Sequence, residues 1–310
     1  MKREFKVTFW GVRGSHPVPG KNTQIFGGNT TCLEVSIGKV IIIIDAGTGI
    51  INLGNRITAD YFASGSKEPL VLTLLFSHLH HDHTQGLPFF TPFYLGQTNL
   101  HFFGPLNFGN ELHRVLEQSM TPPNFPIDFH LSNSVKNITT IKENNIIIID
   151  PDKKIPRLVN THLEKVEGKD TDIIVSIMSG FSHPANGIYV YKIEYSGKSV
   201  VFCTDVEGFM FGDVKLVQFA RGAELLIHDA QYNKKQYTAM PTPRQGFGHS
   251  IPEMAIEVAQ LAEVKNLALT HHDPSSTDTQ LMKYDSQYKK KFESLFYARE
   301  GQIFQIIQDK

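Results

Sequence analysis

The stretch Ser77-His78-Leu79-His80-His81-Asp82-His83 decides the fold of this chain. It follows directly on an apolar run at residues 69–76 (PLVLTLLF), which predicts a buried strand. Side chains two positions apart at a strand end project to the same side, and the turn that follows carries Asp82 and His83 toward a second point nearby. Imidazole and carboxylate groups are typical metal ligands. The stretch therefore predicts a metal site at the end of a buried strand.

Three further apolar segments end in residues of the same kind. His183 follows DIIVSIMSGFS, Asp205 follows VVFCT, and His271 follows NLALT, with His272 as a second candidate beside it. Loops at strand ends are where a rigid scaffold presents ligands to an open site. The candidate metal ligands are His78, His80, Asp82, His83, His183, Asp205 and His271.

This set is too large for one catalytic zinc, which takes three protein ligands and a water. We therefore predict two divalent cations that share a bridging carboxylate and a bridging water. Zinc is the expected metal, with manganese or iron as alternatives, because histidine and carboxylate ligands suit all three.

Composition limits the other possibilities. The chain has 310 residues, 30 Lys and Arg against 31 Asp and Glu, 14 His and 2 Cys. The near-neutral charge excludes a global positive field of the kind that nonspecific nucleic-acid binders use. Two cysteines cannot build a disulfide framework, and no run approaches the roughly 18 apolar residues of a membrane span. We expect a cytoplasmic protein with no membrane partner.

Strand and helix patterns alternate along the chain, which predicts sheets covered by helices. Residues 1–310 are expected to form a single domain with an elaborated insert at about 88–170. Ser250 and Glu253 have capping-box spacing, which predicts the start of a helix with Ile251, Met254, Val258 and Leu261 on its apolar face. A last helix is expected to carry Tyr288, Phe292, Leu295 and Phe296.

The motif His78-x-His80-x-Asp82-His83 resembles the HxHxDH signature of the metallo-β-lactamase fold, and the downstream ligands occur in that family's order. The resemblance implies an α/β (α+β) protein, an αββα sandwich of two mixed β-sheets flanked by helices. Two further segments resemble ribonuclease Z and related phosphodiesterases: His228-Asp229-Ala230, where they have His-Glu-Ala, and Gly248-His249-Ser250. Their LTH motif favours His271 over His272 as the last ligand.

The resemblance also implies roles for these residues. His78, His80 and His183 would hold one metal, Asp82, His83 and His271 the other, and Asp205 would bridge them. A metal-bridging hydroxide would attack phosphorus, and Asp82 could accept its proton. Asp229 and His249 would protonate or stabilise the leaving oxygen. The implied catalytic residues are thus Asp82, Asp229 and His249.

For the substrate, we expect a small phosphodiester such as a cyclic nucleotide. In ribonuclease Z a long insert that grips tRNA lies between the ligands matched by His183 and Asp205, whereas here a hairpin-like segment, GIYVYKIEYSGKSVVFC, fills that interval. The stretches GVRGS, FGGNT, GLPFF and GHS also resemble a bacterial group described as cyclic-nucleotide phosphodiesterase-like. Structured RNA is therefore the less expected partner, and a homodimer is possible.

Several alternatives stay open. The chain could be a ribonuclease Z-like endonuclease that processes RNA 3′ ends, a thioester or lactone hydrolase, or an inactive metal-binding protein on the same fold. Arg13 and the turn at residues 27–30 could contact a substrate phosphate or serve only the local turn. The aromatic residues of Leu87-Pro88-Phe89-Phe90 could stack on a nucleobase or belong to the core.

Overall fold

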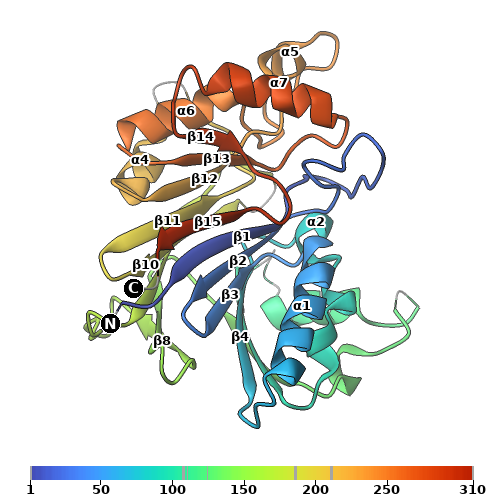
Figure 1. Cartoon of the computed structure of the whole chain (residues 1–310), viewed down its shortest axis with the longest axis vertical. Helices are drawn as coiled ribbons and strands as arrows, with labels where there is room; N and C mark the ends of the chain where they lie inside the picture. Colours follow the sequence, from blue (N-terminus) through green and yellow to red (C-terminus); the bar gives the residue numbers. More distant parts are fainter. Residues whose placement is uncertain are drawn as a thin grey trace.

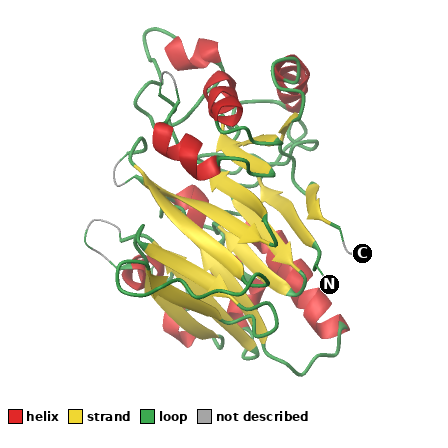
Figure 2. Ribbon diagram, turned by 90° about the vertical axis from the view of Figure 1, so that its left-hand side faces the viewer, coloured by secondary structure: helices red, strands yellow, loops and turns green. Residues whose placement is uncertain are grey.

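Two stacked β-sheets with helices on both outer faces make up the computed structural model of the chain (Figures 1 and 2). The structure describes residues 2–106, 109, 111–123, 125–184, 187–209 and 212–308. The αββα sandwich expected from the sequence is confirmed, and both sheets are mixed.

The first sheet has the strand order β15-β1-β2-β3-β4-β5-β6. Neighbours from β15 to β3 pair antiparallel, and those from β3 to β6 pair parallel. Its strands are β1 (Phe5–Gly11), β2 (Cys32–Ile37), β3 (Val40–Ile44), β4 (Leu70–Leu75), β5 (Thr98–Gly104), β6 (Val135–Thr140) and β15 (Ile303–Ile307).

The second sheet has the order β14-β13-β12-β11-β10-β9-β7-β8, and here the neighbours from β11 to β14 are the parallel ones. Residues 88–170, expected as an insert, supply β5 and β6 to the first sheet and β7 and β8 to the second. The strands of this sheet are β7 (Asn145–Ile149), β8 (Pro156–Asn160), β9 (Ile173–Gly180), β10 (Ile188–Tyr195), β11 (Lys198–Cys203), β12 (Leu225–Asp229), β13 (Leu267–Thr270) and β14 (Leu295–Tyr297).

Three apolar layers hold the sandwich together. Buried side chains of both sheets, such as Val35 and Val175, meet in the central layer. Helices α1 (Gly49–Ala63) and α3 (Leu112–Ser119) cover the first sheet, and α4 (Val214–Ala220), α6 (Pro252–Leu261) and α7 (Asp278–Tyr288) cover the second. The remaining short helices are α2 (His81–Thr84), α5 (Lys234–Thr238), η1 (Leu87–Phe89), η2 (Thr91–Tyr94) and η3 (Phe129–Leu131). No helix among the described residues is both long and apolar enough to cross a bilayer.

Two helix predictions were wrong in detail. The first turn of α6 begins at Pro252, its N-cap is Ile251, and Ser250 makes no capping bond because its hydroxyl donates to the Val206 carbonyl at 2.6 Å. On the expected apolar face of this helix, Leu261 is exposed.

The last helix ends at Tyr288. Residues 295–297 form β14 instead, because pairing with β13 buries Leu295 and Tyr297 beside the sheet.

Candidate metal centre

All of the predicted ligands converge at one end of the sandwich, where the carboxyl ends of β4, β11 and β13 meet. His78 and His80 follow β4, and the one-turn helix α2 carries Asp82 and His83. The loops after β9, β11 and β13 bring in the remaining ligand candidates, His183, Asp205 and His271. Their nitrogen and oxygen atoms form two adjoining clusters, within each of which the ligand atoms lie no more than 4.8 Å apart.

The first cluster, here called the histidine cluster, consists of His78, His80 and His183. The Nε2 atom of His183 lies 3.1 Å from Nδ1 of His80. His80 is exposed to the cleft, while His78 and His183 are buried. This cluster therefore presents three imidazoles with one side open to a ligand.

The second cluster, the carboxylate cluster, consists of Asp82, His83, Asp205 and His271, all of them buried. The Oδ2 atom of Asp205 lies 3.1 Å from Nε2 of His83 and 3.3 Å from Nε2 of His271. Its other oxygen, Oδ1, lies 3.8 Å from Nε2 of His78 and 3.7 Å from Nε2 of His183. Asp205 thus turns one oxygen to each cluster, which is the arrangement a bridging carboxylate requires.

Hydrogen bonds behind the ligands fix the direction of three of the rings. Nδ1 of His83 bonds the Asp45 carboxylate at 2.8 Å, Nδ1 of His183 bonds the Gly248 carbonyl at 3.1 Å, and Nδ1 of His271 lies 3.1 Å from the Gln231 side-chain oxygen. Such partners orient metal-bound imidazoles and raise their basicity. In each ring, Nε2 is left to face the cluster.

Asp45 is a residue that the sequence analysis missed. It ends the apolar strand β3, just as the predicted ligands end theirs, so the same signal could have found it. Its carboxylate also accepts hydrogen bonds from the backbone and hydroxyl of Ser77, each at 2.7 Å. Asp45 therefore joins the loop after β4 to His83.

Backbone strain accompanies the ligand positions. Asp45, Asp205 and His271 have φ angles of 63°, 54° and 60°, in the left-handed region that side chains rarely adopt. Residues held in such conformations cluster at functional sites, where the surrounding structure enforces them. The strain turns the chain sharply at three strand ends and aims the side chains into the site.

The donor set fits divalent cations. The buried Nε2 atoms of His78 and His83 have no hydrogen-bond partner, although unpartnered buried polar atoms are costly. Both atoms face Asp205. Metal coordination would satisfy them, with the histidine cluster and the carboxylate cluster each holding one ion.

The two clusters differ electrostatically. Burial lowers the pKa of His78, His80 and His183, so these rings are neutral and can bind a metal ion without first losing a proton. Burial opposes protonation of His83 as well, but the carboxylates of Asp205, Asp82 and Asp45 raise its pKa. Burial also opposes protonation of His271, but Asp205 and Asp229 raise its pKa to about 10. The carboxylate cluster thus has a negative field suited to a cation.

Asp229 and His249 form a pair beside the clusters. Nδ1 of His249 donates to Oδ2 of Asp229 at 2.9 Å. Asp229 is fully buried and also accepts from the backbone amides of Gln231, Ser250 and Asp205, at 3.1, 2.8 and 3.2 Å. Asp229 thus contacts His249 and, through Oδ2 at 3.4 Å, Nδ1 of His271, while His249 itself lines the cleft.

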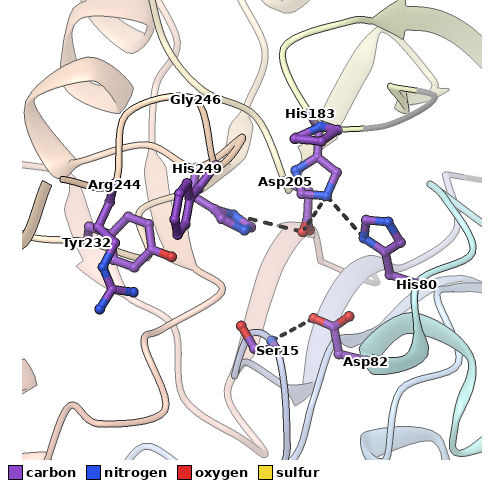
Figure 3. Close-up of a pocket in the computed structure, with 11 residues that line it drawn as sticks. Ser15, His80, Asp82, His183, Asp205, Tyr232, Arg244, Gly246 and His249 are labelled. Atoms are coloured by element: carbon purple, nitrogen blue, oxygen red, sulfur yellow. Dashed lines mark hydrogen bonds and ion pairs between the residues drawn. The ribbon is translucent and has the colours of Figure 1, made fainter. Parts of the chain in front are cut away.

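A cleft of about 560 Å³ opens over these groups, and Figure 3 shows the side chains around it. Among the predicted residues, His80, Asp82, His183, Asp205 and His249 line it. The sequence analysis missed its other side chains, which are Ser15, Pro184, Tyr232, Arg244 and Phe247. An arginine and two aromatic residues close to the GHS motif are the signal that could have indicated them.

Other candidates lie outside the cleft. Arg13 is fully buried and donates to the carbonyls of Gly27, Asp273 and Ser276, so it braces the turns around the site. His272 donates from Nε2 to the Ala298 carbonyl at 2.8 Å, and burial lowers its pKa to about 3. The choice of His271 over His272 therefore agrees with the geometry.

The aromatic residues after the metal motif also lie elsewhere. Phe90 is fully buried under α1, and Phe89 is exposed and packs edge-on against Phe125. Neither is among the described residues that line the cleft.

Comparison with known proteins places this site in context. A family model described as "Beta-lactamase superfamily domain" matches residues 41–272. A ribonuclease Z of Picrophilus torridus is 26% identical, over 99% of this chain and 97% of its own length. Among solved structures, the metallo-β-lactamase fold protein YhfI of Bacillus subtilis superposes with a TM-score of 0.62 at 16% identity, covering 97% of this chain and 99% of its own. The short form of human tRNase Z gives 0.59 at 17% identity, covering 98% and 100%.

Proposed function

The chain belongs to the β-lactamase superfamily, and we propose that it is a metal-dependent phosphodiester hydrolase that cleaves RNA, as a ribonuclease Z-like 3′-processing endonuclease. The observation that carries the proposal is the Asp229–His249 pair, which faces the same cleft as the two ligand clusters. The similarity to a ribonuclease Z along nearly the whole chain favours RNA over the cyclic nucleotide that the sequence analysis put first.

Two divalent cations in the clusters would supply an activated water and neutralise charge on the phosphoryl oxygens. The chain's own residues then have distinct tasks. Asp82 is held by the Ser15 amide, which donates to its Oδ2 at 2.7 Å, and it lines the cleft, where it is placed to take the proton of the attacking water. The charge of His83, together with hydrogen bonds from His271 and His83, lowers the pKa of this carboxyl against its burial, so it is ionised.

His249 acts at the leaving oxygen. With Nδ1–H donating to Asp229, a His249 ring that is also protonated at Nε2 can give that second proton to the alkoxide as the P–O bond breaks, and the ring becomes neutral. Asp229 is a positioning residue, because its carboxylate orients the His249 ring and stabilises the imidazolium form. A thioester hydrolase would not need this pair in order to expel its leaving group, because a thiolate leaves without a proton.

A specific observation supports a second candidate, a hydrolase of small phosphodiesters. Strands β10 and β11 form a tight hairpin that turns at Ser196 and Gly197, in the interval where ribonuclease Z carries its tRNA-gripping insert. The chain also has a net charge of −1. A large folded RNA would therefore have to be held by other surfaces.

Four substrates assayed side by side test the proposal: an RNA with a 3′ trailer, cyclic AMP, bis(p-nitrophenyl) phosphate and an acyl thioester. We expect metal-dependent cleavage of the RNA and of the nitrophenyl diester, and loss of both after chelation or in His80→Ala. His81→Ala is the matched control, because His81 is the exposed neighbour. Hydrolysis of the diester that survives chelation, or turnover of the thioester alone, would contradict the proposal.

A further inference from the structure

One arginine in the cleft has no part in the mechanism proposed above. Arg244 lines it on the side opposite His80 and Asp82, next to Tyr232 and His249 (Figure 3). Within the part of the chain that the structure describes, no carboxylate lies within 4.0 Å of its guanidinium, and its side chain shares a hydrogen bond with the Tyr232 hydroxyl. A cation in a cleft with two carboxylates, Asp82 and Asp205, would pair with them if it could reach them. Arg244 is therefore held apart from the metal ligands, with space between.

Aromatic rings fix this guanidinium. Its central carbon lies 5.2 Å from the ring centre of Tyr232 and 6.0 Å from that of Phe247. Cation–π contacts of this kind occupy the faces of the guanidinium plane and leave its N–H edges free. Tyr232 is buried and also packs edge-on against His249, with ring centres 5.7 Å apart. Arg244 is thus tied to the residue that serves the leaving oxygen.

The backbone around Arg244 is also fixed. We call residues 239–249 the Arg244 loop. The Arg244 amide donates to the Tyr237 carbonyl at 2.9 Å, and the amides of Gly246 and Gly248 donate to the Glu207 carboxylate at 2.9 and 3.0 Å. Tyr237 also donates its hydroxyl to Glu207. An arginine on so well-anchored a loop is pre-organised for a ligand.

A planar guanidinium with free edges matches a phosphate group, which it can bind through two parallel hydrogen bonds. The cleft, at about 560 Å³, has the size of a site for a nucleotide-sized ligand. With one phosphodiester at the metal clusters, the next anionic group along a nucleotide chain would lie toward the Arg244 side.

We propose that Arg244, stacked on Tyr232 and Phe247, binds the phosphate adjacent to the one that is cleaved. The inference rests on the proposed function and sharpens it, because such a subsite selects a substrate with more than one phosphate, an oligonucleotide, over a cyclic nucleotide with a single one. Arg244 is then a substrate-binding residue that determines specificity.

The test compares three dinucleotides: UpU, pUpU with a 5′-phosphate and UpUp with a 3′-phosphate. In the metal-loaded wild type, we expect one of the phosphorylated forms to have a kcat/KM at least about tenfold above that of UpU, the gain expected of a charge-assisted pair. Arg244→Met should abolish this advantage, so that the kcat/KM values of the three dinucleotides lie within about threefold of one another, and Arg244→Lys should retain part of it. The dinucleotide that loses its advantage in Arg244→Met, pUpU or UpUp, shows whether Arg244 binds the phosphate on the 5′ or the 3′ side of the cleaved one.

Arg299→Met is the matched control. Arg299 also stacks on an aromatic ring, with its guanidinium carbon 4.6 Å from the ring centre of Phe26, but it does not line the cleft. Calorimetric binding of the same dinucleotides to metal-stripped protein gives a second readout, which should show the same preference and the same loss in Arg244→Met.

The proposal is overturned if the wild type shows no preference for either phosphorylated form, or if the preference survives in Arg244→Met. If the metal-loaded protein cleaves neither UpU nor bis(p-nitrophenyl) phosphate but still binds a phosphorylated form more tightly through Arg244, the proposed function fails and the subsite stands.

Discussion

The two sides of the cleft are built on different principles. On the ligand side, His80, Asp82, His183 and Asp205 lie on or directly after strands and a short helix of the sandwich, and buried hydrogen bonds hold the last three of them. On the opposite side, the Arg244 loop is irregular and is tied down through Glu207. In the proposed function, the rigid sheets would hold the groups that carry out the chemistry, whereas a loop anchored at a few points would make the contacts that select the substrate.

The ligand side should show the largest effect of a single change. Asp205→Asn removes the carboxylate that faces both clusters, so we expect the metal content to fall from two ions per chain to one or none. Activity on bis(p-nitrophenyl) phosphate should drop at least about 10³-fold, because several kcal/mol of transition-state stabilisation depend on the metals. Elemental analysis and steady-state rates measure both quantities. Asp170→Asn, on an exposed segment, is the control, and a fully active, two-metal Asp205→Asn protein would contradict the assignment.

His249 lies where the two sides of the cleft meet, and the loss of activity when it is replaced should depend on the leaving group of the substrate. In His249→Ala we expect cleavage of RNA, which expels a poor alkoxide, to slow about 10²-fold, the usual contribution of a general acid. Hydrolysis of the nitrophenyl diester should change less than about threefold, because nitrophenolate leaves without a proton. Equal losses on the two substrates, at unchanged metal content, would show that His249 has another role.

The electrostatic contrast between the clusters predicts a pH dependence of metal binding. The raised pKa values of His83 and His271 mean that the metal-stripped protein holds protons there at pH 7. These protons stabilise the stripped fold fully below pH about 6.5, and their contribution is lost as the pH rises toward about 10, the pKa of His271.

A metal ion must displace these protons, so its affinity should rise with pH, by about tenfold per pH unit for each proton released. The lowered pKa values of the histidine cluster predict no such release from that side. Calorimetry in buffers of different ionisation enthalpy counts the protons, and His271→Ala should release fewer than wild type. Proton uptake on metal binding would contradict the electrostatic difference between the histidine cluster and the carboxylate cluster.

The Arg244 side should show the smallest effects. Glu207→Gln weakens the anchor of the loop, and we expect the free energy of unfolding to fall by about 1–2 kcal/mol, as for the loss of charge-assisted hydrogen bonds. KM for RNA should rise several-fold, while the rate constant for the nitrophenyl diester should stay within about threefold. Denaturant titration and kinetics test this, with the exposed Glu164→Gln as control. A large loss of kcat with unchanged stability would mean that the loop takes part in the chemistry itself.

The ligand side could be predicted from the sequence because it follows from local pattern. An apolar run that ends in histidine or aspartate marks a strand end, and the first such motif, at residues 77–83, has the spacing of metal ligands. Asp45 shows the limit of this reasoning: the strand-end pattern could mark it as a candidate, but nothing in the sequence pairs it with His83. The last helix shows another limit, because the spacing of apolar residues predicted a helix at Leu295, whereas this residue lies in a strand that pairs with β13.

By itself, then, the sequence determined the alternation of strands and helices and the candidate ligand set, because hydrophobic periodicity and residue chemistry are local properties of the chain. The resemblance of its motifs to a known family added the sandwich and the Asp229–His249 pair. Only the tertiary structure decided that Arg13 is a buried brace, that Asp45 orients His83, and that Arg244 lies across the cleft. These facts depend on which side chains from distant segments meet. They also depend on whether an arginine side chain is buried against backbone carbonyls or lines an open cleft. That is settled by packing and desolvation in the folded protein.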